Sequence, residues 1–190
     1  MGGGQQVEQQ AGVRGAPADE AGRFVDVVAT NVDDVWRSQI PDYQPPEAVV
    51  IYDRATGTGC GLGQSAMGPF YCPPDRKVYL DLSFWEELET KFGAAGDAAR
   101  AYVIAHEIGH HVQNLLGVMA DVDRERQEDP GSANELSVRL ELQADCLAGI
   151  WGHAANAQGD LLEPGDLEEG LAAAAAVGDC LLYTSDAADE

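Results

Sequence analysis

Residues 101–116 read AYVIAHEIGHHVQNLL, and their apolar positions recur at the period of an α-helix. His106 and His110 are four residues apart, so their side chains lie on one face of the predicted helix. Two imidazoles placed in this way can bind one zinc ion at about 2.0–2.1 Å each. Glu107 is rotated by about 100° and can reach a zinc-bound water rather than the metal. The segment therefore predicts a metal site with a catalytic base.

A pair of surface histidines on an amphipathic helix would show the same spacing. Three of the four histidines in the chain, however, lie at positions 106, 110 and 111. Helix interiors have no propensity reason to collect histidine, so the clustering favours a site. His111 is rotated away from His110, and we expect it to pack or hydrogen-bond elsewhere.

A catalytic zinc site needs a third protein ligand and leaves the fourth position open for water. Gln113 and Leu116 occupy the positions where metzincins have a glycine and a third histidine, so that class is excluded. Glu141 and Asp145 are again four residues apart, on one face of a later predicted helix. We expect Glu141 to bind zinc and Asp145 to accept the N–H of a ligating histidine.

Alternatives remain for this downstream pair. An ordinary acidic helix face would also place Glu141 and Asp145 together, and only their coupling to the upstream motif favours the functional interpretation. Glu135 and His153 are weaker candidates for the third ligand.

The chain resembles the bacterial family of putative neutral zinc metallopeptidases, which are similar to gluzincins in having H-E-x-x-H followed by E-x-x-x-D. The resemblance covers about residues 20–179. The matching segments are 58–61, 64–73, 78–84, 105–113, 136–146 and 165–169.

The resemblance implies an α+β, zincin-like fold: a small β-sheet, the H-E-x-x-H helix, and a following helix with the third zinc ligand. It implies one Zn²⁺ per chain and a peptide or protein substrate. Family members usually carry an N-terminal membrane anchor and export the peptidase domain. An extracytoplasmic location is therefore expected for full-length relatives.

Both ends depart from the family pattern. Residues 1–18 are rich in Gly, Gln and Ala and are predicted to be disordered. No run approaches the roughly 18 apolar residues of a membrane-spanning helix, and no signal peptide is recognisable, so we expect no membrane contact from this chain itself. The resemblance stops near residue 179. We expect residues 19–179 to form a C-terminally incomplete peptidase domain and residues 180–190 to be a non-native tail.

The charge balance excludes one class of partner. The chain has 190 residues, enough for one sizeable core, and a net charge of −22 with Lys77 and Lys91 as its only lysines. Such a surface repels phosphate backbones, so we expect no nucleic-acid binding.

Two cysteines flank a glycine-rich stretch. Cys60 and Cys72 are placed to close a short loop as a disulfide, which would imply an oxidising compartment; two free thiols are the alternative. Cys146 follows Asp145 and is expected to be a small buried apolar residue.

The remaining pattern indicates alternating short strands and longer helices. In zincin folds an edge strand aligns the extended substrate, and by analogy Lys77–Leu82 is the candidate for that strand. The sequence predicts helices at 19–38, 83–92, 97–116, 132–158 and 166–176, strands at 48–53 and 77–82, a loop or hairpin at 55–75 and a mobile loop at 118–131.

The predicted activity is zinc-dependent hydrolysis of peptide bonds. His106, His110 and Glu141 would hold the metal, and Glu107 would activate the zinc-bound water. His153, about three helical turns after Glu141, is a candidate to stabilise the transition state. The alternative is a catalytically inactive zinc-binding module of peptidase fold that acts in protein binding.

Overall fold

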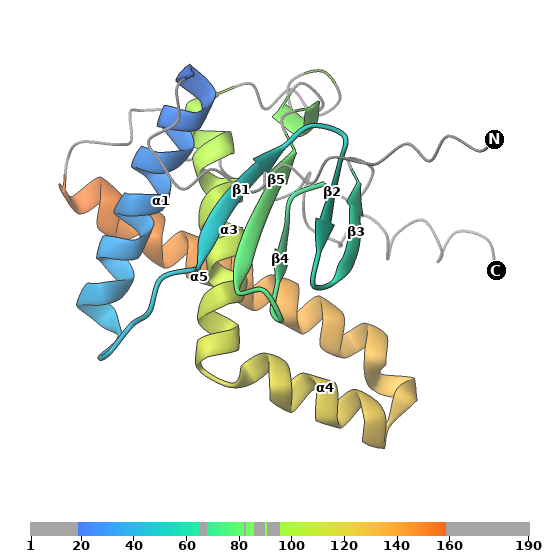
Figure 1. Cartoon of the computed structure of the whole chain (residues 1–190). Helices are drawn as coiled ribbons and strands as arrows, with labels where there is room; N and C mark the ends of the chain where they lie inside the picture. Colours follow the sequence, from blue (N-terminus) through green and yellow to red (C-terminus); the bar gives the residue numbers. More distant parts are fainter. Residues whose placement is uncertain (1–18, 65–67, 82, 86–89, 91–95, 159–190) are drawn as a thin grey trace, which may run out of the picture.

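A three-stranded sheet packs against the helices in the computed structural model (Figure 1). Its strand order is β1-β5-β4, formed by Ala48–Tyr52, Lys77–Asp81 and Phe70–Cys72. Strand β1 runs parallel to β5, and β4 runs antiparallel to it. The structure describes residues 19–64, 68–81, 83–85, 90 and 96–158.

Alternate side chains of β5 pack into two hydrophobic clusters, one on each face of the sheet. Val78 and Leu80 are fully buried against the helices, whereas Tyr79 packs on the opposite face. There the ring of Tyr79 stacks on Phe70 with ring centroids 5.0 Å apart. Since successive side chains of a strand point to opposite faces, one short strand can support both clusters.

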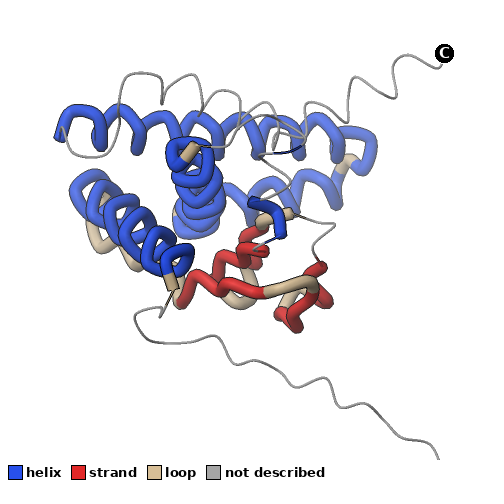
Figure 2. The backbone as a smooth tube through the Cα atoms, turned by 90° about the horizontal axis from the view of Figure 1, so that it is seen from above, coloured by secondary structure: helices blue, strands red, loops and turns tan. Residues whose placement is uncertain are grey.

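The helices cover one face of the sheet, as Figure 2 shows from above. Helix α3 is buried along most of its length and contacts both α1 and α5. Valines from α1, isoleucines from α3 and Trp151 from α5 share one apolar core with the sheet. The helices are α1 (Glu20–Gln39), α3 (Asp97–Leu115), α4 (Val118–Glu128), the 3-10 turn η2 (Pro130–Ser132) and α5 (Ala133–Gln158).

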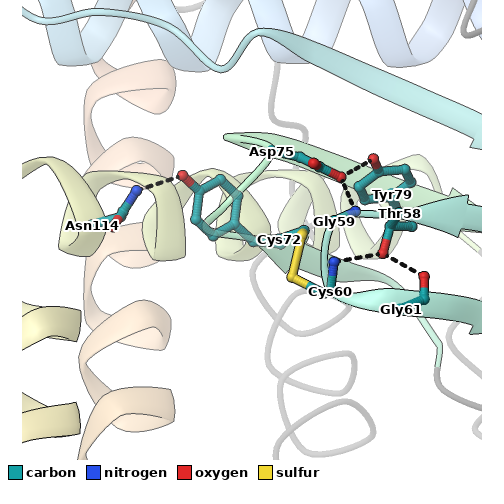
Figure 3. Close-up of a disulfide and its surroundings, with 9 residues drawn as sticks. Thr58, Gly59, Cys60, Gly61, Cys72, Asp75, Tyr79 and Asn114 are labelled. Carbon is teal, nitrogen blue, oxygen red and sulfur yellow. Dashed lines mark hydrogen bonds between the residues drawn. A yellow bond between two sulfur atoms is a disulfide. The ribbon is translucent and has the colours of Figure 1, made fainter.

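A β-hairpin is linked to the sheet by a disulfide and by hydrogen bonds to one carboxylate (Figure 3). Strands β2 (Ala55–Thr58) and β3 (Gly61–Gln64) form it. At its turn, Cys60 forms a disulfide with Cys72 of β4, with 5.8 Å between the two Cα atoms. Beside it, the Asp75 carboxylate accepts hydrogen bonds at 2.6 Å from the Gly59 N–H and from the Tyr79 hydroxyl.

Much of the predicted layout is confirmed. The α+β class holds, and the helices at 19–38 and 132–158 and the strand at 48–53 have the expected bounds to within one residue. The stretch 55–75 holds a hairpin followed by strand β4. Gly117 follows α3 in the left-handed conformation expected of a helix-ending glycine, with φ of 79°.

Two predictions about elements are wrong. Residues 118–131 are not a mobile loop, because helix α4 and the turn η2 occupy them. Strand β5 is not an edge strand, because it pairs with β1 on one side and with β4 on the other.

Some predictions lie outside the described residues. These are the segments 1–18, 166–176 and 180–190, and most of the short helix at 83–92. Among the helices that are described, none is long and apolar enough to cross a membrane.

Candidate metal centre

The two histidines of the H-E-x-x-H pattern lie on the buried side of α3. His106 and His110 are 2% and 8% exposed. Their ring centroids are 4.8 Å apart with the rings edge to face, a contact that i and i+4 positions on a helix allow. The predicted helix therefore presents both imidazoles at one place.

Helix α5 brings a carboxylate to this place. Oε2 of Glu141 lies 3.1 Å from Nε2 of His106 and 3.3 Å from Nε2 of His110. The three ligand atoms all lie within 4.8 Å of one another. Tetrahedral zinc with bonds near 2.0–2.2 Å separates its ligand atoms by roughly 3.3–3.5 Å. The two nitrogen–oxygen distances are close to this value, so two imidazoles and one carboxylate could hold a metal ion here.

The close packing of α3 on α5 makes this approach possible. A Cβ atom at Gly109, between the two histidines, would lie only 3.2 Å from the Ala144 carbonyl oxygen of α5. Glycine at this position therefore lets the two helices come near enough for Glu141 to reach the imidazoles.

The other ring nitrogen of His106 is held by α5. Its Nδ1 lies 2.9 Å from Oδ1 of Asp145, and the Tyr102 hydroxyl donates to the same oxygen. A carboxylate on Nδ1 keeps a hydrogen on that nitrogen, so Nε2, which faces Glu141, is the nitrogen that would offer its lone pair to a metal. Asp145 therefore contacts His106, one of the two histidines proposed from the sequence as metal ligands.

His110 has a different partner. Its Nδ1 lies 2.8 Å from Oε1 of Gln113, a residue that is fully buried. The amide nitrogen of Gln113 donates to the Leu140 carbonyl of α5 at 2.7 Å. Sequence reasoning missed this contact and used Gln113 only to exclude a class. The signal was its position three residues after His110, on the same helical face.

Glu107 lies beside the three ligands and is 3% exposed. Burial raises the pKa of its carboxyl, and the nearby Glu141 charge adds to the rise. The charges of His106 and His110 and a backbone hydrogen bond from Tyr71 of β4 oppose it. A buried carboxyl with a raised pKa next to candidate metal ligands suits a general base.

The carboxylates make the site favourable for positive charge. Burial alone would lower the pKa of His106, but hydrogen bonds to Asp145 and Glu141 and the Glu107 charge together raise it to about 10. The hydrogen bonds from the two imidazoles conversely lower the pKa of Glu141, against the effect of its burial. The same arrangement attracts a metal cation.

The third clustered histidine has a structural role, as expected. His111 is fully buried, its Nε2 lies 2.7 Å from the Gln44 carbonyl oxygen, and its Nδ1 lies 3.0 Å from the Tyr71 hydroxyl. Asn114 donates to that hydroxyl at 3.0 Å (Figure 3). This network ties α3 to strand β4, and β4 also supplies the backbone contact to Glu107.

The structure does not bring the remaining candidates to the centre. His153 is exposed and lies twelve residues after Glu141, about 18 Å along α5. Glu135 is exposed and pairs with Arg139 at 2.5 Å. Cys146 is a free, exposed thiol, so its prediction as a buried apolar residue is wrong. It lies on the solvent side of α5, whereas Ala144 and Ala148 face the core.

Comparison with known proteins identifies a family and several relatives of this chain. A family model described as "Putative neutral zinc metallopeptidase" matches residues 1–187, a wider span than the resemblance at 20–179. The chain is 52% identical over 184 residues to the uncharacterized protein YpfJ of Escherichia coli (strain K12), covering 93% of this chain and 63% of that protein. No solved structure matches the chain significantly.

A mycobacterial relative is also similar. The uncharacterized protein Rv2575 of Mycobacterium tuberculosis (strain ATCC 25618 / H37Rv) is 46% identical over 174 residues, covering 84% of this chain and 58% of that protein. The chain therefore spans less than two thirds of the length of these relatives.

Proposed function

The chain belongs to the putative neutral zinc metallopeptidase family, and we propose on this basis that it is a zinc-dependent metalloendopeptidase of zincin-like fold. One observation carries the proposal: His106, His110 and Glu141 converge within 4.8 Å beside the buried carboxyl of Glu107. Helices α3 and α5 supply these groups, in an arrangement that would suit metal-assisted peptide hydrolysis.

Zinc bound to these residues would lower the pKa of a water ligand to about 7 and polarise the scissile carbonyl. The protein's own side chains and backbone would transfer the protons and hold the reacting groups in position. Glu107 accepts a proton from the attacking water and then delivers it to the leaving amine. Asp145 and the Tyr71 backbone N–H hold His106 and Glu107, respectively, in their positions.

The substrate is proposed to be an extended peptide. Within the described sheet the edge strands are β1 and β4, and β4 is the one that touches Glu107 through Tyr71. An extended peptide can add to an exposed sheet edge by backbone pairing. Strand β4 therefore replaces β5 as the proposed substrate strand.

We also propose that the domain acts outside the cytoplasm. The Cys60–Cys72 disulfide supports this location, because disulfides persist in oxidising compartments.

The test compares wild type with Glu107→Gln on a peptide library read by mass spectrometry, with zinc content measured on the same samples. The amide of the variant keeps the side-chain volume but cannot act as a base. We expect cleavage to fall by about 10²–10⁴-fold with zinc content unchanged. Zinc binding by wild type without any cleavage would instead support the inactive, protein-binding alternative.

A further inference from the structure

We propose that Gln113 is a positioning residue that sets which nitrogen of His110 faces the metal and that holds α5 at the register where Glu141 completes the site. The inference rests on the proposed zinc site and deepens it. It assigns a role to a fully buried amide that the H-E-x-x-H pattern does not include.

The orientation of the Gln113 amide follows from its neighbour on α5. The Leu140 backbone carbonyl can only accept a hydrogen bond, so the Gln113 atom 2.7 Å from it must be the amide nitrogen. The second donor of that nitrogen reaches Oε1 of Gln143 at 2.9 Å. Both amide hydrogens are therefore used, and the amide oxygen must be the atom that faces His110.

This orientation decides the tautomer of His110. An amide oxygen can only accept, so Nδ1 of His110, 2.8 Å away, must carry the hydrogen. Nε2, which faces Oε2 of Glu141 at 3.3 Å, is then the nitrogen that would offer its lone pair to a bound metal. Gln113 thus accepts a hydrogen bond from Nδ1 of His110, as Asp145 does from Nδ1 of His106.

The choice of an amide has an electrostatic reason. Glu107, Glu141 and Asp145 already contribute three carboxyl groups around the two histidines. An amide oxygen orients the imidazole without a fourth negative charge in the buried site, where unbalanced charge is costly.

The same side chain joins the two helices that carry the ligands. Leu140 directly precedes Glu141, so the hydrogen bond from Gln113 holds the backbone next to the third ligand. One buried amide therefore couples the direction of His110 to the position of Glu141. Loss of partners that orient metal ligands typically costs 10–100-fold in metal affinity.

The test measures the zinc dissociation constant by competition with a chromophoric chelator for wild type, Gln113→Met, Gln113→Glu and Gln143→Ala. Methionine keeps the length of the side chain but removes both polar ends, and we expect zinc binding 10–100-fold weaker. Glutamate keeps an acceptor for His110 but cannot donate to Leu140, and we expect a loss within the same range. The matched control Gln143→Ala removes only the second acceptor and should stay within about threefold of wild type.

Imidazole ¹⁵N–¹H correlation spectra of the zinc-loaded proteins provide the second readout. Wild type should show solvent-protected Nδ1–H signals from His106 and His110, and Gln113→Met should lose protection only at His110. If Gln113→Met fails to fold, the affinity of Gln113→Glu decides: a wild-type dissociation constant would overturn the inference.

The two proposals fail in different ways. Absence of zinc binding by wild type would overturn the proposed metal centre. Wild-type zinc affinity in Gln113→Met, with an unchanged His110 signal, would overturn only the positioning role of Gln113.

Discussion

The three clustered histidines of α3 differ in the partners of their ring nitrogens. His106 and His110 each have an acceptor at Nδ1, which leaves Nε2 to face Glu141. His111 instead faces the Gln44 carbonyl with Nε2 and the Tyr71 hydroxyl with Nδ1, so neither of its nitrogens faces Glu141. At the scale of a residue, the partners of the ring nitrogens therefore distinguish the two proposed metal ligands from a third, structural histidine.

A polar pair outside the centre gives a pH-dependent prediction. The Tyr43 hydroxyl donates to Oδ1 of Asp33 at 2.7 Å, and burial raises the pKa of this carboxyl from 3.8 to about 6. Between these values the folded chain binds more protons than the unfolded chain, so this group's contribution to stability falls as pH rises. The loss is complete about one pH unit above this folded-state pKa.

Asp33→Asn removes the titration and keeps an oxygen for Tyr43. We expect the free energy of unfolding of the variant, relative to wild type, to rise by about 2 kcal/mol from pH 4 to pH 7. Urea denaturation at four pH values measures the difference. Parallel stability curves for the two proteins would contradict the assignment.

At the residue scale, local spacing was enough to name His106, Glu107 and His110 as candidates for the site. The spacing of Glu141 and Asp145 added the candidate third ligand and its neighbour. Local spacing could not identify Tyr71, since a backbone contact from a distant strand leaves no signature in side-chain types. It also gave the wrong environment for Cys146, because the phase of a long helix depends on what packs against it.

At the scale of elements, the proposed metal centre depends on how closely α3 and α5 approach. We expect Gly109→Ala to push the helices apart by a few tenths of an ångström at Ala144 and to weaken zinc binding, because Glu141 moves with α5. The matched control is Gly149→Ala on α5, where an added Cβ meets no atom within 4 Å.

The control should be more stable than wild type by about 0.5–1 kcal/mol, since alanine suits a helix interior better than glycine. Thermal unfolding and zinc titration of both variants check these outcomes. Equal zinc affinity of Gly109→Ala and wild type would show that the close approach does not set the position of Glu141.

A second prediction at this scale concerns the contribution of the Cys60–Cys72 disulfide to stability. It closes a loop across a sequence separation of 12 and fastens the hairpin β2–β3 to β4. We expect the double substitution of Cys60 and Cys72 by serine to lower the free energy of unfolding by about 3 kcal/mol. Denaturant unfolding measures this, with Cys146→Ser as the control that leaves stability unchanged because its thiol is free and exposed. A loss in the control as large as in the double variant would contradict this account.

Tertiary context explains the elements that sequence reasoning misjudged. Helix α4 has no buried residue in the structure, and its acidic sequence next to Pro130 and Gly131 resembled a loop. It is supported by ion pairs within the helix and by a hydrogen bond from Arg126 to Ser137 of α5 at 2.6 Å. Strand β5 carried a clear alternating pattern, but its place in the sheet depends on pairing with β1 and β4, which alternation alone does not specify.

At the scale of the whole molecule, the net charge of −22 is a source of self-repulsion in the compact state. Raising the ionic strength from 0.01 to 0.15 M shortens the Debye length from about 30 to about 8 Å. We therefore expect the thermal midpoint to rise over this interval. Scanning calorimetry in NaCl and in choline chloride separates screening from sodium binding; a midpoint that falls in both salts would contradict the expectation.

The central claim is that α3 and α5 together form one zinc site. The most direct measurement is the zinc content per chain, by mass spectrometry of loaded and dialysed protein, for wild type, Glu141→Ala and Glu135→Ala. Both glutamates lie on α5, but Glu135 is exposed and pairs with Arg139. The account predicts about one zinc per chain in wild type and Glu135→Ala, and loss of most of it in Glu141→Ala. Full zinc content in Glu141→Ala, or none in wild type, would contradict it.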